Sequence, residues 1–390
     1  MNLVWEFDME IRENDGSSSA QENFVGILEL AECERYGQLI SCSDNGVEDM
    51  ANPYVGMDML RKYHLRRGQK VSATILPRSN FPNPKVVSID KIDDMLPEER
   101  NRCVAFDRLV SEQPHRQIVL ECVGCSLSSR IIDLFCPMGR GQRGIIVSPP
   151  RAGKTLLLHE LAKSIGNNFP EIVLIVALID ERPEEITDFK RSVCAEIYAS
   201  SNDQGSKNHV RIGRLASERA RNLAESGRDV VLFIDSMTRL ARAHNAVGGN
   251  GRTMTGGIDA RAMENTRKIF ALARDTKTAG SLTVIATALV DTGSKMDDLI
   301  FQELRGTGNL EIILSRKLAE MRVWPAIDLH ASGTRHEELL MSSQMLNSAS
   351  FLRRAFANTE TEKATESLIS RLSQYENNRA FLSMIAKSCK

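Results

Sequence analysis

The loop Ser148-Pro149-Pro150-Arg151-Ala152-Gly153-Lys154-Thr155 is the feature that most constrains what this chain can fold into. It stands between an apolar run, residues 144–147, and a helix-like apolar stretch that begins at Leu156. Backbone N–H groups between a strand and a helix, together with the helix N-terminus, form a positive cup for nucleotide phosphates. Ser148 takes a place that such loops usually give to glycine, so the pattern alone also fits an ordinary strand–turn–helix.

The loop predicts separate roles for its residues. Lys154 would reach the β- and γ-phosphates, and the Thr155 hydroxyl would bind Mg²⁺. A later apolar run, residues 229–236, carries Asp235 at the end of a buried-strand pattern. A carboxylate at the carboxyl end of a parallel strand lies beside the metal in such folds, so Asp235 is the second predicted magnesium ligand. The predicted nucleotide-binding residues are Pro150, Arg151, Ala152, Gly153, Lys154, Thr155 and Leu156.

A third apolar run, residues 172–179, leads directly into Asp180-Glu181-Arg182-Pro183-Glu184-Glu185. A carboxylate one residue beyond such a strand can polarise an attacking water, so Glu181 is the predicted general base. Glu184 and Glu185 have a simpler interpretation, because acidic residues in the first turn of a helix stabilise its dipole.

Charge and hydropathy limit the classes of function. The 390 residues include 50 Lys and Arg and 51 Asp and Glu, so any contact with nucleic acid must come from local groups. No apolar run approaches the roughly 18 residues that a membrane-spanning helix needs, and the acidic start, residues 1–8, lacks the charge pattern of a signal peptide. We therefore expect a cytoplasmic protein without membrane contact.

Cysteine and histidine give no strong metal pattern. The eight cysteines are scattered among core-like segments, as expected for reduced thiols in an intracellular protein. Cys122 and Cys125 have the spacing of a metal or redox pair, but no second pair stands at a matching distance. The sequence therefore argues against a zinc site.

Turn clusters and apolar runs divide the chain into four parts. Residues 1–22 are an acidic tail, either disordered or a docking peptide, and residues 23–95 carry short β-like runs whose spacing suits a small five-stranded barrel. Residues 96–140 are a connector. Residues 141–390 alternate strand and helix patterns, which predicts an α/β fold with a mostly parallel sheet and an amphipathic helical end over 361–387. The predicted strands of this last part are 144–147, 172–179, 230–234, 282–288 and 310–314.

Several motifs in one order resemble the family of bacterial transcription termination factor Rho. The resemblance covers residues 25–390 and is strongest over 139–338. Beside the phosphate loop and the 180–185 run, it rests on Thr238-Arg239-Leu240-Ala241-Arg242-Ala243, Ala286-Thr287-Ala288-Leu289, Asp291-Thr292-Gly293-Ser294-Lys295-Met296-Asp297 and Ser332-Gly333-Thr334-Arg335. It implies a RecA-like ATPase motor domain behind an OB/cold-shock-type barrel. It also implies a homohexamer that hydrolyses ATP with Mg²⁺, moves along nascent RNA and terminates transcription by RNA polymerase.

The resemblance assigns further roles. Arg335 matches the position from which a neighbouring subunit reaches the γ-phosphate, and Arg182 matches a residue that senses this phosphate, since a guanidinium neutralises charge that builds in the transition state. Two loops that line the family's central channel are present, residues 248–257 and 293–295. A Gly-rich loop is otherwise an ordinary mobile connector, and the first loop is shorter than the family's. The RNA-binding residues that the resemblance implies in these loops are Arg252, Thr253, Gly256 and Lys295.

The barrel departs from the family pattern. Where the family stacks bases on aromatics in a strand resembling Gly-Phe-Gly-Phe-Leu-Arg, this chain has Arg35-Tyr36-Gly37-Gln38-Leu39-Ile40. Tyr36 keeps a stacking face, and Tyr54 matches another family aromatic. Each base stacked on an aromatic ring contributes about 1–3 kcal/mol, so Gln38 and Ile40 predict weaker RNA binding by the barrel. The residues before the barrel do not resemble the family's N-terminal helical domain, which indicates a divergent or reduced member.

Two other classes of function compete with an RNA-dependent ATPase. A rotary or secretion-type ATPase shares the RecA-like core but moves protein segments, and its family does not resemble the segment around Lys295. A regulatory protein without catalysis could still join rings, but every predicted nucleotide-handling position has a chemically able residue. We therefore favour the RNA-dependent ATPase.

Overall fold

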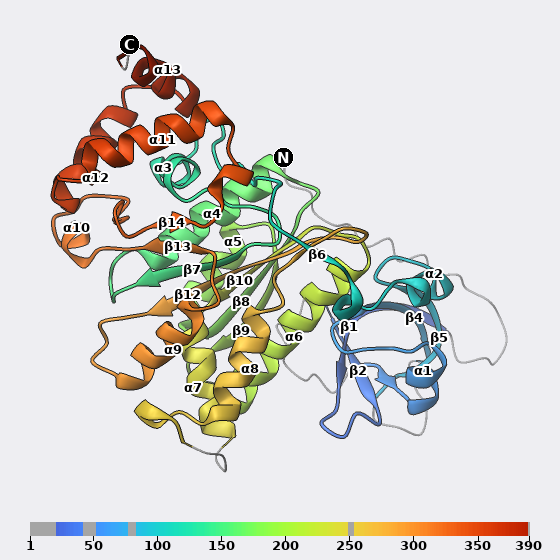
Figure 1. Ribbon diagram of the computed structural model, residues 1–390. Helices are drawn as coiled ribbons and strands as arrows, with labels where there is room; N and C mark the ends of the chain where they lie inside the picture. The colour runs from blue at the N-terminus through green and yellow to red at the C-terminus, as the bar shows by residue number, and fades with distance from the viewer. Residues whose placement is uncertain (1–20, 42–51, 77–82, 249–252, 389–390) are drawn as a thin grey trace.

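The computed structural model describes residues 21–41, 52–76, 83–248 and 253–388. A small barrel lies beside a larger α/β domain, and the C-terminal helices lie at the end of the α/β domain that is far from the barrel (Figure 1). Among the described residues, no helix has the length and apolar character that crossing a bilayer requires.

The first domain is a closed barrel with strand order β1-β2-β3-β5-β4. In β4, Val71, Ala73 and Ile75 alternate with more exposed residues and face the barrel core, as the two-residue period of a strand requires. The predicted five-stranded barrel is confirmed, and its fifth strand is the short β3, which has no apolar run of its own. The elements are β1 Glu22–Leu30, β2 Gly37–Ser41, β3 Tyr54–Val55, α1 Met57–Lys62, β4 Lys70–Leu76 and β5 Lys85–Ile92.

The second domain is built on a seven-stranded sheet with order β14-β13-β7-β12-β10-β8-β9, parallel except for the edge strand β14. This confirms the predicted RecA-like α/β class, although β9 and β14 were not predicted. Both are edge strands, and neither is a long apolar run. The strands are β7 Arg143–Ser148, β8 Val173–Glu181, β9 Glu196–Ser201, β10 Val230–Asp235, β12 Leu282–Leu289, β13 Leu310–Ile313 and β14 Gly333–Thr334.

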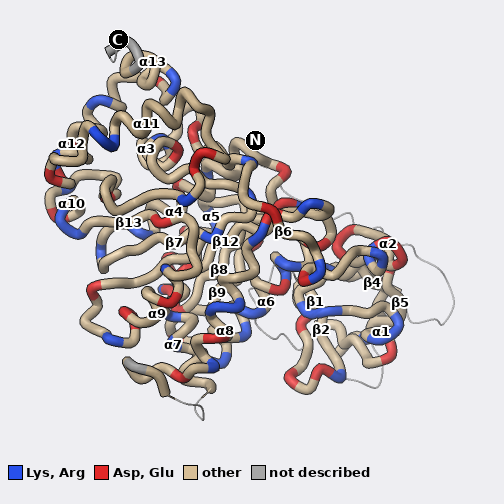
Figure 2. The backbone as a smooth tube through the Cα atoms, viewed as in Figure 1, with Lys and Arg blue, Asp and Glu red and all other residues tan. Residues whose placement is uncertain are grey.

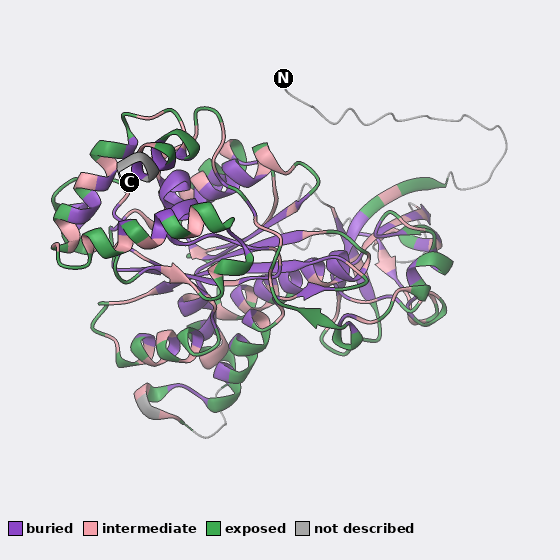
Figure 3. Ribbon diagram, turned by 45° about the horizontal axis from the view of Figure 1, so that its top comes forward, coloured by how far each residue is buried: buried purple, intermediate pink, exposed green. Residues whose placement is uncertain are grey.

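Helices cover both faces of this sheet, and successive strand residues pack into two different cores. In β7, Ile146 packs with α3, α4 and the C-terminal helices, whereas Ile145 and Val147 pack with the helices α6 to α9. Buried residues are concentrated along the sheet strands between these layers (Figure 3). The helices are α3 Leu127–Phe135, α4 Lys154–Asn168, α5 Pro183–Ser192, α6 Ser206–Glu225, α7 Met237–Val247, α8 Ala260–Phe270, α9 Lys295–Arg305 and α10 Arg316–Glu320.

The predicted helical end over 361–387 is confirmed, and it consists of two helices. α12 Thr361–Leu372 ends before a turn, and α13 Asn378–Ser388 follows. Both lie near α11 Ser343–Phe356, and Leu368, Leu372 and Phe381 are fully buried against the same core. The turn lets apolar residues of both helices reach one face, which a single straight helix of this sequence would not do.

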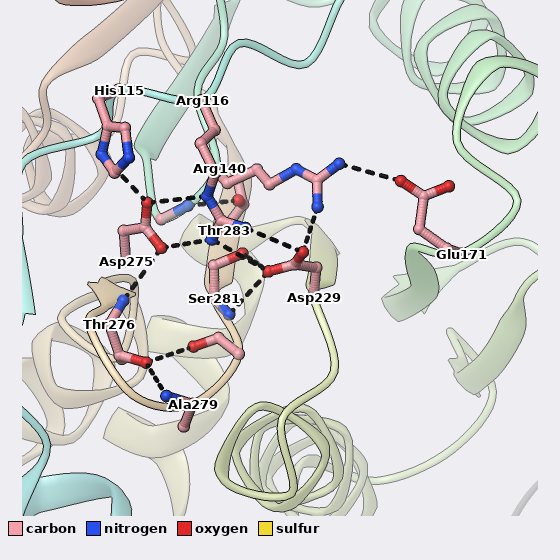
Figure 4. A network of polar contacts seen from close by, with 12 residues as sticks. His115, Arg116, Arg140, Glu171, Asp229, Asp275, Thr276, Ala279, Ser281 and Thr283 are labelled. Carbon is pink, nitrogen blue, oxygen red and sulfur yellow. Dashed lines mark hydrogen bonds and ion pairs between the residues drawn. The ribbon is translucent and has the colours of Figure 1, made fainter.

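The connector is fastened to the amino ends of the sheet strands by ion pairs (Figure 4). Arg116 lies 2.6 Å from Asp275 and 3.3 Å from Asp229, and Arg140 pairs with Asp229 as well. Asp229 directly precedes β10, so this network lies at the amino ends of the strands. The predicted nucleotide site lies at their carboxyl ends. The connector elements are α2 Pro97–Arg102, the short helix Phe106–Arg108 and β6 Ser111–Glu112, which pairs with β11 Asp275–Thr276.

The barrel meets the α/β domain along α6, where acidic and basic residues of both domains come together (Figure 2). Asp93 at the end of the barrel accepts hydrogen bonds from Arg219 of α6 at 2.8 Å and from Arg100 of α2 at 2.9 Å. All three side chains are at most 3% exposed. Arg100 also pairs with Glu225 at 2.8 Å. A buried charge that lost its partners would be costly, so this cluster fixes the barrel in place.

Candidate active site

The phosphate loop has the backbone that its sequence predicts. β7 ends at Ser148, and α4 begins at Lys154 with Gly153 as its N-cap. Gly153 has φ 87°, and an added Cβ there would lie 2.5 Å from Cζ3 of Trp324, so both the backbone conformation and the close approach require glycine. The first N–H groups of a helix have no partner within the helix, and loop and helix together therefore fit a phosphate group.

Lys154 at the start of α4 meets Glu181 and Asp235, which end the neighbouring strands β8 and β10. Nζ of Lys154 donates to Oε1 of Glu181 at 3.0 Å and to Oδ1 of Asp235. The two carboxylate side chains are at most 4% exposed. Burial lowers the pKa of Lys154, but Asp235 and Glu181 more than offset this, and its pKa lies above the usual value. Burial and the nearby Asp235 carboxylate raise the pKa of Glu181, although Lys154 and Arg239 oppose the shift.

An irregularity at the end of β8 positions Glu181. The pairing of β8 with β9 shifts register between Ile179 and Glu181, and Asp180 has φ 58°. Glu181 is therefore the last residue of β8. The sequence had predicted a strand that ends at Ile179, with Glu181 beyond it. A bulge of this kind re-aims the following side chain, here toward Lys154.

Arg239 joins this cluster from α7 and is absent from the predicted site residues. Its Nη1 lies 3.0 Å from Oε1 of Glu181 and donates to the backbone oxygen of Asp180. The sequence feature that could have identified Arg239 is its place on a helix that starts at the carboxyl end of β10, four residues after Asp235. Which side of that helix faces Glu181 depends on the packing of α7 and not on the local sequence.

The predicted magnesium ligands are both oxygen donors at the edge of this cluster. Thr155 Oγ1 donates to Oε2 of Glu185 at 3.4 Å, and Oδ1 of Asp235 accepts from Thr287 at 2.8 Å. Mg²⁺ prefers hydroxyl, carboxylate, phosphate and water oxygens and takes few ligands from the protein, so this donor set fits the ion. The described residues contain no group of three or more His, Cys, Asp or Glu side chains that could hold a metal ion by themselves.

A pocket lies beside the phosphate loop. It has a volume of about 190 Å³, and its wall includes Gly153, Leu156, Trp324 and the start of α3 at Ser126. Leu156 and Trp324 are 57% and 38% exposed. An exposed apolar side chain and an indole face beside a phosphate site fit the base of a nucleotide. Leu156 belongs to the predicted nucleotide-binding residues, whereas Trp324 does not.

Arg182 and Arg335 lie apart from the cluster around Lys154. Arg182 precedes α5 and is exposed, and Arg335 is exposed directly after the edge strand β14. Within the described part of the chain, neither side chain has an ion pair or a hydrogen bond, and Arg335 only donates its backbone N–H to Asn309. Both guanidinium groups are therefore free for a phosphate.

The two predicted channel loops contact each other. An added Cβ at Gly256, which has φ 82°, would lie 2.9 Å from the backbone oxygen of Lys295. Thr253 is exposed and forms a β-bridge with Asp259. Arg252 lies outside the described residues. The arrangement brings Gly256 and Lys295 together, although they are 39 positions apart in the sequence.

α7 connects these loops to the carboxylate cluster. Arg239 near its start contacts Glu181, and Arg242 one turn later pairs with the fully buried Asp297 at 2.5 Å. Thr292, directly before the second loop, donates to the same carboxylate at 2.6 Å. Asn245 near the helix end accepts from the backbone N–H of Asp259 at 2.6 Å. One helix thus holds the base of both loops.

Tyr36 and Tyr54 form one aromatic surface on the barrel. Their ring centroids are 5.6 Å apart with an angle of 29° between the planes, and Tyr36 is 41% exposed. Gln38, two residues after Tyr36, pairs with Tyr54 across β2 and β3. The two rings, 18 positions apart in the sequence, therefore stack on each other as one aromatic pair.

Comparison with known proteins identifies the family. Residues 128–334 match the model of the ATP synthase alpha/beta family, nucleotide-binding domain. Transcription termination factor Rho of Cereibacter sphaeroides is 44% identical over 91% of this chain and 85% of its own length. Rho of Bacillus subtilis is 42% identical over 96% of this chain and 88% of its own length, and Rho of Thermotoga maritima is 41% identical over 93% and 85%. The chain belongs to the Rho family. It is an ATP-hydrolysing enzyme of that family.

Solved structures with the same fold include ATPases outside the Rho family. A type III secretion system ATPase aligns with TM-score 0.58 at 23% identity over 72% of this chain and 82% of its own, which shows the fold alone. The assembled ATPase EscN from enteropathogenic E. coli aligns with TM-score 0.55 at 26% identity over 68% and 62%. The secretion-type alternative therefore shares the RecA-like core with this protein, whereas its Rho relatives match almost the whole chain at much higher identity.

Proposed function

We propose that this protein is an ATP-driven RNA translocase that works as a homohexameric ring and terminates transcription. The observation that carries the proposal is the double attachment of α7. Its Arg239 contacts the carboxylate of Glu181 beside the phosphate loop, and its Arg242 holds Asp297 beneath the loop of Lys295. A change around the nucleotide can therefore move the channel loops through a single rigid element.

The nucleotide chemistry follows from the cluster. Lys154 binds the β- and γ-phosphates, and the carboxylate of Glu181 takes a proton from the attacking water. Thr155 and Asp235 would hold Mg²⁺, which supplies positive charge against the phosphate oxygens. Arg182 senses the γ-phosphate of its own subunit. Arg335 lies on the sheet edge without a partner of its own among the described residues, as expected for an arginine that serves a neighbouring subunit's nucleotide.

The RNA contacts divide between two sites. Arg252, Thr253, Gly256 and Lys295 form the channel site, where charge binds RNA phosphates. Tyr36 and Tyr54 form a barrel site with one stacking face. RNA polymerase, whose nascent transcript supplies the RNA, is the further partner, and such a protein works in the cytoplasm.

The rate of ATP hydrolysis by the full chain, with and without poly(C) or structured RNA, tests this function. We expect RNA to raise the rate about tenfold or more, which is about 1.4 kcal/mol of activation free energy. The purified protein should also form hexamers. Hydrolysis that RNA leaves unchanged but a polypeptide stimulates would instead favour the secretion-type alternative.

A further inference from the structure

The turn Cys122-Val123-Gly124-Cys125 projects from the domain immediately before α3. The backbone N–H of Cys125 donates to the oxygen of Cys122 at 3.1 Å, and Gly124 has φ 74°. These are the features of a type II β-turn, in which the first and fourth Cα atoms lie within about 7 Å. A disulfide needs Cα atoms about 4.4–6.8 Å apart, so the turn already brings the two cysteines within disulfide range.

Both thiols are free and accessible. Cys122 and Cys125 are half-buried, Val123 between them is fully exposed, and a Cβ on Gly124 would meet no atom within 4 Å. Each of the other described cysteines lies elsewhere in the sequence: Cys33, Cys103, Cys136 and Cys194. Burial raises the pKa of the Cys125 thiol.

The turn lies between two attachments to α4, the helix that starts at the phosphate loop. Before the turn, Asn168 at the end of α4 donates to the backbone oxygens of Val119 and Glu121 at 2.8 and 3.0 Å. After it, Ser129 of α3 hydrogen-bonds to Ser164 of α4 at 2.8 Å. A change in the turn therefore acts directly on segments held by α4.

The residues that follow Cys125 also form part of the nucleotide pocket. Ser126, Leu127 and Ser128 line the cavity that contains Gly153, Leu156 and Trp324. Ser126 caps α3, since its side chain accepts from the backbone N–H of Ser129 at 3.4 Å. Movement of Cys125 would displace this cap and the wall of the pocket together.

We propose that Cys122 and Cys125 are a reversible dithiol–disulfide pair that couples the thiol redox state of the surroundings to nucleotide binding. The oxidant is a low-molecular-weight disulfide such as glutathione disulfide. The Cys122 thiolate attacks one of its sulfurs and releases one glutathione thiolate. The Cys125 thiolate then attacks the Cys122 sulfur of the mixed disulfide and releases the second. The protein loses two electrons and two protons, and one glutathione disulfide becomes two glutathiones.

The dithiol form is the one that fits the nucleotide. The pocket described above belongs to the form in which both thiols are free. A disulfide also requires a Cβ–S–S–Cβ dihedral near 90°, so closing the bond readjusts the turn that directly precedes Ser126 and the pocket wall. Oxidation therefore weakens nucleotide binding, and by thermodynamic linkage bound nucleotide favours the dithiol by the same factor. This coupling rests on the proposed nucleotide site, whereas the disulfide itself does not.

Mass spectrometry of the full-length protein in glutathione redox buffers tests the proposal. Trypsin releases residues 117–130 as one peptide that contains Cys122 and Cys125 and no other cysteine. We expect this peptide to interconvert reversibly between the dithiol and a form lighter by two hydrogen atoms. A non-hydrolysable ATP analogue should lower the equilibrium constant for oxidation about tenfold, equivalent to about 30 mV for a two-electron couple.

Matched variants separate the outcomes. Cys194→Ser removes an exposed cysteine outside the turn and should leave both effects intact, whereas Cys122→Ser should abolish the lighter peptide and make nucleotide affinity independent of the redox buffer. A peptide that never loses two hydrogens in excess glutathione disulfide overturns the pair. If bound nucleotide leaves the equilibrium constant for oxidation unchanged, or raises it, the coupling is overturned. Failure of the reduced protein to bind the analogue would contradict the nucleotide site. The disulfide would still be tested independently, by the peptide mass measured without nucleotide.

Discussion

The ammonium of Lys154 donates a hydrogen bond of 3.0 Å to the carboxylate of Glu181, the residue that would activate water. The same ammonium contacts Asp235, so two buried carboxylates share one positive charge from Lys154. A nucleotide phosphate competes for that charge. We therefore expect binding to draw Lys154 toward the phosphates and to leave Glu181 free to accept a proton, with Arg239 still holding it at 3.0 Å.

Lys154→Ala should abolish ATP hydrolysis, because the β- and γ-phosphates lose their fixed positive partner and two carboxylates then face the phosphates. Lys163→Ala is the matched control, since Lys163 lies on the same helix but is exposed. Steady-state phosphate release measures both variants. Near-normal turnover by Lys154→Ala would rule out the predicted nucleotide site.

Glu181→Gln should retain nucleotide binding but slow hydrolysis by about two to four orders of magnitude, the usual effect of losing a positioned base. A base acts only when deprotonated, and the pKa of Glu181 is raised by burial and by Asp235. The wild-type rate should therefore fall as pH decreases through that raised pKa, and the variant should lack this limb. The exposed Glu184→Gln is the control. An equal loss of binding and turnover in Glu181→Gln would show that Glu181 is not the base.

Arg335→Ala should leave nucleotide binding by each subunit nearly intact while it suppresses turnover, because a guanidinium supplied by a neighbour acts mainly on transition-state charge. Mixing Arg335→Ala with Lys154→Ala subunits gives a direct measurement. Some interfaces of a mixed ring combine an intact Arg335 with an intact Lys154, so ATPase activity should recover in part. Mixed hexamers that are confirmed by mass and show no recovery would contradict the role in trans.

Asp93→Asn should destabilise the protein by about 3 kcal/mol, near the lower end of the cost of breaking a buried ion pair, because Glu196 and Glu225 still partner Arg219 and Arg100. Asn keeps the shape and tolerates the backbone of Asp93, whose φ is 52°. The neighbouring Asp94→Asn is a close control, since Asp94 also has positive φ but its side chain is 61% exposed. Chemical denaturation measures both. Equal losses of stability would show that the buried cluster does not anchor the barrel.

The sequence predicted the features that are local and left out those that depend on packing. The phosphate loop, the strand that ends at Asp235 and the barrel strands β1, β2 and β4 each depend on a few consecutive residues, and the structure has them where they were expected. Trp324 and Arg239 reach the nucleotide site from elements whose orientation is set by the sheet, so no spacing rule identifies them. The edge strand β9 is only partly buried and gave no apolar run. The stacking of Tyr36 on Tyr54 likewise arises from pairing between strands.

RNA binding should depend more on the channel than on the barrel. Lys295→Ala should remove RNA stimulation of ATP hydrolysis and reduce the slope of log affinity against log salt by about one, because one phosphate contact and its counterion release are lost. Tyr36→Ala should weaken RNA binding less than about tenfold, near the low end of what one stacked base contributes, since Tyr54 remains beside it.

Lys277→Ala is the control for the loss of an exposed lysine outside the channel. RNA affinity measured over a range of salt, together with RNA-stimulated ATPase, distinguishes the two sites. If Tyr36→Ala abolishes RNA binding while Lys295→Ala has no effect, the barrel is the principal RNA-binding site. Gln38 and Ile40 would then not have weakened RNA binding by the barrel.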